Sequence, residues 1–323
     1  MKLSQSEVVE LASAEGFDPQ TLEKVLHLMN ILNMFNAHPY MMGKWLLKGG
    51  TALNLFLLNL PRLSVDIDLN YIGALDRDTM AAQRPKIEQA MQAVFSREGF
   101  SVRRVPTDHA GGKWRCVYQS FSGRTGNLEV DFNFMFRQPL WDMAVADSIQ
   151  LGRHRASRIF ILDVHELTAG KLAALLARAQ VRDLFDCHQI FSTIKLDPKM
   201  LRIGFVVYGG MNRKDWRTVA VDNLGFEPHD LANRLYPTLR PSAMPVGATP
   251  LEYGQSLVDQ CRNHLSAVLP FTNAESNFLN ALLEEGRVEA NYLTDDAQLI
   301  HRIESHPLLQ WKALNVRQHK GLM

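Results

Sequence analysis

The segment 46–69 reads LLKGGTALNLFLLNLPRLSVDIDL and combines a glycine pair with two aspartates two positions apart. Residues 45–50 (WLLKGG) are predicted to form a strand that meets a turn. Residues 51–60 suit a helix ended by Pro61, because proline cannot continue the hydrogen-bond ladder. In residues 64–72 apolar and polar side chains alternate, which predicts a strand with one buried face.

Asp66 and Asp68 are the sharpest chemical feature of this segment. Residues two apart on a strand point to the same face, with Cα atoms roughly 6–7 Å apart. Two carboxylates that close repel each other unless a cation lies between them. Magnesium suits that position because it binds carboxylates together with phosphate oxygens. The alternative is an acidic strand face that is only solvated.

A third carboxylate is available from a second alternating segment, NLEVDFNFMF at 127–136. Its apolar positions predict a buried strand face, so Asp131 is expected to point away from the core. Two metal ions bridged by Asp66, Asp68 and Asp131 would activate an attacking hydroxyl and stabilise a leaving pyrophosphate. Taken alone, Asp131 is equally compatible with a solvated strand face.

The glycine pair is a candidate phosphate site. Gly49, Gly50 and Thr51 lie at the predicted strand-to-helix junction, where backbone N–H groups can approach a phosphate closely. Thr51 would cap the helix or contact a phosphate. Lys48 precedes the glycines and is included in the predicted nucleotide-binding set. The alternative is an ordinary tight turn, and the spacing does not match a P-loop.

The predicted helix 165–179 carries Lys171, whose leucine neighbours leave it near the edge of the buried stripe. A lysine there would hold a triphosphate, or would simply be solvated. The predicted helix 182–193 follows and contains Asp183 and Asp186. The alternative is that both aspartates only cap the start of this helix and form salt bridges there.

Periodicity assigns most of the remaining chain. Helices are predicted over 4–15, 19–36, 79–98, 274–286 and 295–303, and strands over 100–105 and 114–121 around a Gly-Gly turn at 111–112. Residues 150–162 are basic and strand-like, and 236–254 is a proline-rich loop. The fold class is therefore α+β, with an α/β region over 1–162 and a mostly helical region over 163–323.

Composition excludes several classes of protein. The chain of 323 residues has a formal net charge of +1 and three cysteines. The cysteines are far apart and form no CxxC pair, which argues against a cysteine-based zinc site or a disulfide framework. No apolar run approaches a membrane span, and the N-terminus lacks the pattern of a signal peptide. A cytoplasmic protein without membrane contact is expected.

Three ordered motifs resemble those of the AbiEii/AbiGii family of nucleotidyltransferase toxins. The first is the segment 46–69, with Gly-Gly, a following helix, an arginine and Ser-x-Asp-x-Asp. The second is EVDFNF at 129–134. The third is ELTAGKLAALLARAQVRDLFD at 166–186, which is similar to Lys-x-x-Ala…Arg…Arg-Asp-x-x-Asp.

The resemblance implies a polymerase-β-like nucleotidyltransferase core followed by a helical domain. It implies that Asp66 and Asp68 bind Mg²⁺ or Mn²⁺, that Asp131 supplies the third carboxylate, and that Ser64 joins Gly49 and Gly50 at the phosphates of an NTP. Lys171 and Asp183 match positions needed for activity, and Asp186 is a weaker match.

Family members act as toxins of two-gene systems, and some of them abort phage infection. Some add nucleotides to the 3′ end of tRNA, so the resemblance implies transfer of a nucleotide to an acceptor such as the tRNA 3′ end. It also implies a winged-helix antitoxin encoded by a neighbouring gene. Arg153, Arg155 and Arg158 are candidates to cradle the tRNA backbone, or form a solvated edge strand.

Two other functions fit the same motifs. One is a kinase on the same fold, which phosphorylates a protein or RNA by attack at the γ-phosphorus. The other is a module that binds a nucleotide without turnover. The motifs do not separate these from nucleotidyl transfer, whereas the released product does. No site residue is carried over to 194–323.

Overall fold

The computed structural model describes residues 1, 3–107 and 111–322, and the chain divides into two compact units. The first unit comprises residues 1–137, 143–162 and 236–244. The second comprises residues 138–142, 163–235 and 245–323. Two short segments therefore belong to a different unit from the residues that flank them in sequence.

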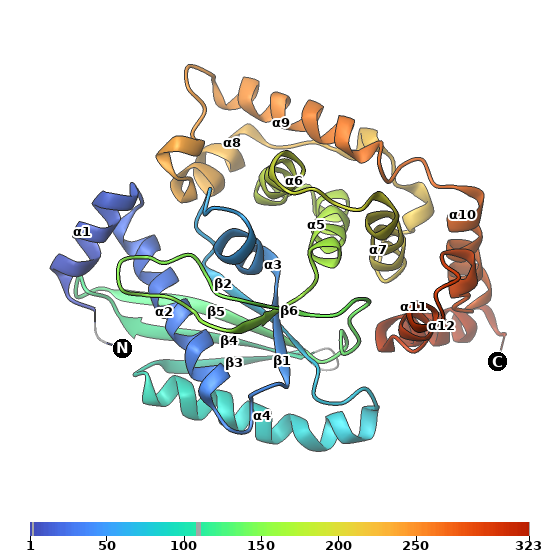
Figure 1. The fold of residues 1–323 in the computed structure, drawn as a ribbon, viewed down its shortest axis with the longest axis horizontal. Helices are drawn as coiled ribbons and strands as arrows, with labels where there is room; N and C mark the ends of the chain where they lie inside the picture. The colour runs from blue at the N-terminus through green and yellow to red at the C-terminus, as the bar shows by residue number, and fades with distance from the viewer. Residues whose placement is uncertain (2, 108–110, 323) are drawn as a thin grey trace. The chain divides into compact units, whose positions relative to one another are not determined.

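The first unit is built on a seven-stranded sheet (Figure 1). The strands follow the order β3 (Ser101–Thr107), β4 (Gly111–Gln119), β5 (Thr125–Asn133), β2 (Asp66–Tyr71), β1 (Trp45–Lys48), β7 (Ile159–Ile161) and β6 (Ala144–Ala146). β2 and β5 are parallel, as are β1 and β7, whereas the other neighbours are antiparallel. The predicted α+β fold class is confirmed, and the sheet is mixed.

One face of this sheet carries the core of the first unit. The alternating side chains Ile67 and Leu69 of β2, and Val130 and Phe132 of β5, are fully buried. The helices α2 (Pro19–Ala37) and α4 (Arg77–Arg97) contact each other and pack on the strands, while α1 (Gln5–Glu15) packs on α2. The strand alternation then sends the polar side chains of β2 and β5 to the opposite face.

The helix after the glycine pair is shorter than predicted. The helix α3 (Gly49–Ala52) begins at the glycines themselves and continues as a π-helical turn, Leu53–Leu57. Leu58 is already extended, and Leu60 has a φ of 50°. Proline disfavours the helical conformation in the residue before it, so Pro61 ends the helix earlier than its own position.

The prediction of a turn at Gly111 and Gly112 is wrong. Both residues lie within β4, where they face Asn133 and Phe132 of β5. A Cβ on Gly111 would lie 2.0 Å from the Phe132 carbonyl oxygen, so the close approach of the strands requires glycine there. The residues that join β3 to β4 lie outside the described residues.

The second unit is helical, as predicted. Its longer helices are α5 (Val164–Arg178), α6 (Val181–Thr193), α7 (Pro198–Gly210), α9 (Pro250–Leu265), α10 (Asn273–Asn280), α11 (Ala297–Glu304) and α12 (Pro307–Lys320). The helices α6 and α7 both pack on α5, and α9 packs on α6. None of the helices in the described part of the chain has the length and apolar character needed to cross a membrane.

Two expectations for irregular segments need correction. The loop predicted over 236–254 ends at Thr249, because α9 begins at Pro250 with a capping box formed by Thr249 and Glu252. Proline is favoured at the first helical position, so Pro250 starts a helix rather than extending a loop. In the basic segment 150–162, regular strand is confined to Ile159–Ile161.

Candidate active site

A row of charged residues crosses the polar face of the sheet in the first unit. Strand register pairs Lys48 of β1 with Asp68 of β2, Asp68 with Asp131 of β5, and Asp131 with Lys113 of β4. Directly paired residues on neighbouring strands have Cβ atoms roughly 4.5–5.5 Å apart. Two carboxylates therefore lie side by side at the centre of the row, with a lysine beyond each of them.

Asp68 and Asp131 have no direct counterion in the part of the chain that the structure describes, since no hydrogen bond or ion pair joins either to another described residue. Burial raises the pKa of Asp131, and the charge of Asp68 raises it further against the opposing influence of Lys48 and Lys113. Two adjacent carboxylates that lack a counterion are suited to bind a divalent cation, which would relieve their mutual repulsion.

The protein side chains alone do not form a closed metal cage. Within the described residues, no group of three or more His, Cys, Asp or Glu side chains is already arranged to hold a metal ion. The assignment of Asp66, Asp68 and Asp131 as metal ligands therefore stays a prediction. Magnesium usually completes its octahedron with water and substrate phosphate oxygens rather than with protein groups alone.

A second row of charges differs from the first because one of its two carboxylates, Glu129, is paired with cations. Register pairs Asp66 with Glu129 and Glu129 with Arg115. The Glu129 carboxylate lies 3.0 Å from Arg115 Nη2 and 3.1 Å from Lys113 Nζ. Arg115 first and then Lys113 lower the pKa of Glu129, with burial opposing them. Sequence reasoning did not single out Lys113, Arg115 or Glu129, although polar residues alternate with buried ones along 113–119.

The glycine pair packs directly against predicted site residues. Gly49 has a φ of 73°, and a Cβ there would lie 2.2 Å from Asp68 Oδ2. A Cβ on Gly50 would lie 2.9 Å from Ser64 Oγ. The absence of side chains at both positions thus lets the turn contact Asp68 and Ser64, which an ordinary surface turn would not require.

Thr51 has a partner inside the protein. Its side chain is fully buried, and its hydroxyl donates to the Asp66 carbonyl oxygen at 2.5 Å and lies 3.1 Å from Ser64 Oγ. The hydroxyl thus ties α3 to the start of β2. The predicted contact of Thr51 with a phosphate stays a prediction.

The close approach at Gly49 predicts a large effect for Gly49→Ala. A methyl group would displace the Asp68 carboxylate, and a misplacement of about 1 Å can cost roughly 10²-fold in rate. Gly43→Ala is the matched control, because Gly43 has a φ of 72° and a Cβ there would meet nothing within 4 Å. Both variants carry the left-handed strain of about 1–2 kcal/mol. Rates of nucleotide transfer and melting temperatures measure the difference, and equal activity in the two variants would rule out the proposed role of this contact.

The second unit holds a buried ionic cluster at the third motif. Lys171 Nζ lies 2.9 Å from Asp183 Oδ1 and 3.0 Å from Asp186 Oδ2, and Arg178 Nε lies 2.8 Å from Asp183 Oδ2. Burial alone would raise the pKa of Asp183, but Lys171 and Arg178 outweigh it and lower that pKa. The cluster joins α5 to α6.

The expected position of Lys171 near a helix edge is wrong, and so is the alternative of a solvated lysine. Lys171 is 9% exposed and Asp186 fully buried, because α6 packs over this face of α5. Lys171 and Asp183 belong to the second unit, whereas Asp66, Asp68 and Asp131 belong to the first. Their joint action in catalysis stays a prediction.

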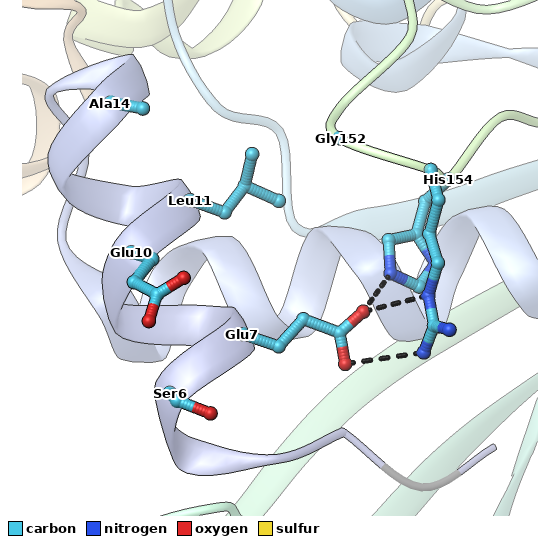
Figure 2. A pocket seen from close by; sticks show the side chains of 8 residues that line it. Ser6, Glu7, Glu10, Leu11, Ala14, Gly152 and His154 are labelled. Atoms are coloured by element: carbon cyan, nitrogen blue, oxygen red, sulfur yellow. Dashed lines mark hydrogen bonds and ion pairs between the residues drawn. The ribbon is translucent and has the colours of Figure 1, made fainter.

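Two of the arginines expected to cradle RNA already have acidic partners. Arg153 Nε lies 2.8 Å and His154 Nε2 3.0 Å from Glu7 Oε1, and Figure 2 shows the Glu7 side chain directed from α1 toward His154. Arg155 Nη2 lies 3.2 Å from Asp147 Oδ2. An open pocket of about 470 Å³ beside Glu7 and Gly152 is lined by Arg153 but by none of the predicted catalytic, nucleotide-binding or metal-binding residues.

Comparison with known proteins identifies the family and the fold. The family model described as "Nucleotidyl transferase AbiEii toxin, Type IV TA system" matches residues 31–243. The nucleotidyltransferase toxin MenT4 from Mycobacterium tuberculosis H37Rv has a similar structure, with a TM-score of 0.61 and 18% identity over 90% of this chain and 98% of that chain. At this identity the similarity shows the fold. No curated protein matches the sequence.

Proposed function

Because the chain belongs to the AbiEii family of nucleotidyltransferase toxins of type IV toxin–antitoxin systems, we propose that it transfers a nucleoside monophosphate from an NTP to an acceptor hydroxyl at the Asp68–Asp131 row. The observation that carries this proposal is the register of β2 and β5, which places these two carboxylates side by side. Neither has a hydrogen bond or ion pair with another described residue.

Different residues around the Asp68–Asp131 row bind the cation and the triphosphate. Asp66, Asp68 and Asp131 would hold Mg²⁺ or Mn²⁺, which when bound lowers the pKa of the acceptor hydroxyl and offsets charge on the phosphates. Backbone N–H groups of Gly49 and Gly50, with Ser64 beside them, bind the triphosphate on the β1 side of the carboxylates. Lys48 adds a positive charge at the same end of the row.

Lys171 and Asp183 contribute from the second unit. Both are buried in one ionic cluster with Asp186 and Arg178. We assign them the role of fixing α5 against α6, so that the third motif keeps the shape that activity needs. Removal of either partner would leave an uncompensated buried charge, which is costly.

The proposed acceptor is the 3′ end of tRNA, and the proposed consequence is growth inhibition or abortive phage infection. A toxin of this type requires an antitoxin, for which we propose a winged-helix protein encoded by a neighbouring gene. These assignments follow from the family rather than from a contact in the structure. They place the enzyme in the cytoplasm, where NTP, tRNA and antitoxin are available.

The released product tests the proposal. Purified protein is incubated with total tRNA, Mg²⁺ and each α-³²P-labelled NTP in turn. We expect label on tRNA from one preferred NTP, release of pyrophosphate, and loss of both on addition of EDTA. Label transferred from γ-³²P-NTP instead would identify a kinase. Nucleotide binding without transfer of either label to tRNA, to other RNA or to protein would leave a module without turnover.

A further inference from the structure

We propose that the basic side chains of Lys113, Arg115 and Arg103, on the polar face of β4 and β3, bind the sugar–phosphate backbone of a polynucleotide acceptor. This inference rests on the proposed nucleotidyl transfer and names the surface on which its acceptor lies. The three residues, called the β3–β4 basic face below, share one side of the sheet. Strand register pairs Arg103 with Arg115 and places Lys113 beside Asp131.

The order of the strands separates two sides of the carboxylate row. Gly49, Gly50 and Lys48 lie on the β1 side of Asp68, whereas the β3–β4 basic face lies beyond Asp131 on the β5 side. In-line displacement at the α-phosphorus brings the nucleophile from the side opposite the leaving pyrophosphate. If the triphosphate binds at the glycines, the acceptor must therefore approach from the β4 side.

The β3–β4 basic face is accessible and is not fully neutralised. The Arg115 side chain is 56% exposed and that of Lys113 42% exposed. Both share one carboxylate, Glu129, so the two cations face a single anion. Arg103 is also exposed and has no ion pair among the residues that the structure describes. The result is a local excess of positive charge within one or two strands of the carboxylates.

A polynucleotide fits this surface better than a compact acceptor does. Lys113 and Arg115 are two residues apart on one strand, roughly 6–7 Å, and Arg103 extends the same face to a neighbouring strand about 5 Å away. Arginine binds phosphate in a planar, bidentate geometry. A chain of phosphates could contact all three cations while its terminal hydroxyl reaches Asp131, whereas a small hydroxyl substrate would leave them unused.

The test compares salt-dependent binding of total tRNA, labelled with fluorescein at the 5′ end, in the absence of NTP. Fluorescence anisotropy gives Kd for the wild type, for Arg103→Gln and for Arg103→Gln/Arg115→Gln between about 50 and 300 mM NaCl, a range over which phosphate contacts change Kd strongly. Arg77→Gln/Arg97→Gln is the matched control, because it removes the same charge from the first unit at two exposed arginines of α4.

We expect the Arg103→Gln/Arg115→Gln variant to bind about tenfold more weakly at low salt and to lose about 1.4–1.8 from the slope of log Kd against log salt. The Arg103→Gln variant should show about half of this loss of slope. Because Arg103 does not pair with Glu129, that loss cannot arise from freeing the Glu129 carboxylate. The control should match the wild type. Melting temperatures verify that all the variants are folded.

An unchanged slope in both β3–β4 variants would overturn the inference, and so would a loss confined to the Arg77/Arg97 control. Failure of the proposed function looks different. In that case no α-label is transferred by the wild type, whatever the binding data show. Label transfer with wild-type slopes in the variants would retain the activity and move the acceptor to another surface.

Discussion

Asp68→Asn is expected to lower the rate of nucleotide transfer by about 10³-fold or more, a loss of roughly 4 kcal/mol in transition-state stabilisation. The substitution keeps the shape of the side chain and removes the charge that the proposed cation needs. Because Asp68 lies beside Asp131 without a described ion pair, the loss of charge also removes a repulsion. The melting temperature should therefore stay the same or rise.

Asp147→Asn is the matched control for this result. Asp147 is another aspartate of the first unit. It pairs with the exposed Arg155 and accepts a hydrogen bond from the Arg158 backbone N–H, which an asparagine oxygen can also accept. Exposed ion pairs contribute roughly 0–1 kcal/mol, so this variant should keep both its activity and its melting temperature. Initial rates with α-labelled NTP and thermal unfolding measure the two quantities. A folded Asp68→Asn protein with wild-type rates would refute the assignment of the site.

Lys171→Met is expected to destabilise the second unit by about 3–5 kcal/mol, because it leaves two buried carboxylates without their shared cation. Lys171 Nζ contacts both Asp183 and Asp186 at 3.0 Å or less. For a unit of this size, the change corresponds to a drop in melting temperature of roughly 6–20 °C. Lys195→Met is the control, because Lys195 is exposed and surface substitutions usually stay within about 0.5 kcal/mol.

The triple variant Lys171→Met/Asp183→Asn/Asp186→Asn distinguishes pairing from direct contact with substrate. Replacement of a buried ionic group is often close to neutral. Arg178, the one member of the cluster left unchanged, is largely exposed, so the triple variant should regain most of the lost stability. Retained stability in Lys171→Met together with lost activity would contradict the assigned role. It would indicate instead that the lysine acts on the nucleotide.

The two acidic strands were the part of the site most accessible to sequence reasoning. Alternation along 64–72 and 127–136 predicts which side chains leave the core, and the structure buries Ile67 and Val130 as that pattern requires. The pairing of Asp68 with Asp131, by contrast, could not be predicted from the sequence. It depends on the register of two parallel strands separated by about sixty residues, which no local pattern specifies.

Tertiary packing explains the predictions that were wrong. Lys171 appeared to lie at the edge of a leucine stripe, but α6 covers that face and supplies two carboxylates. Gly111 and Gly112 resemble a turn in sequence, yet the close approach of Phe132 on β5 requires them inside a strand. By contrast, the start of α9 was locally encoded by Thr249, Pro250 and Glu252, and only the interpretation of the proline was at fault.

The central claim is that Asp68 and Asp131 together form the cation site at which the NTP reacts. The most direct test is calorimetric titration of Mn²⁺ into the protein with a non-hydrolysable α,β-methylene NTP, for the wild type, Asp131→Asn and Asp147→Asn. Binding should weaken at least about tenfold in Asp131→Asn, because loss of one ligand of a divalent ion costs on the order of 1.4 kcal/mol or more. The Asp147→Asn protein should match the wild type. Equal binding by all three proteins would contradict the claim and place the cation elsewhere.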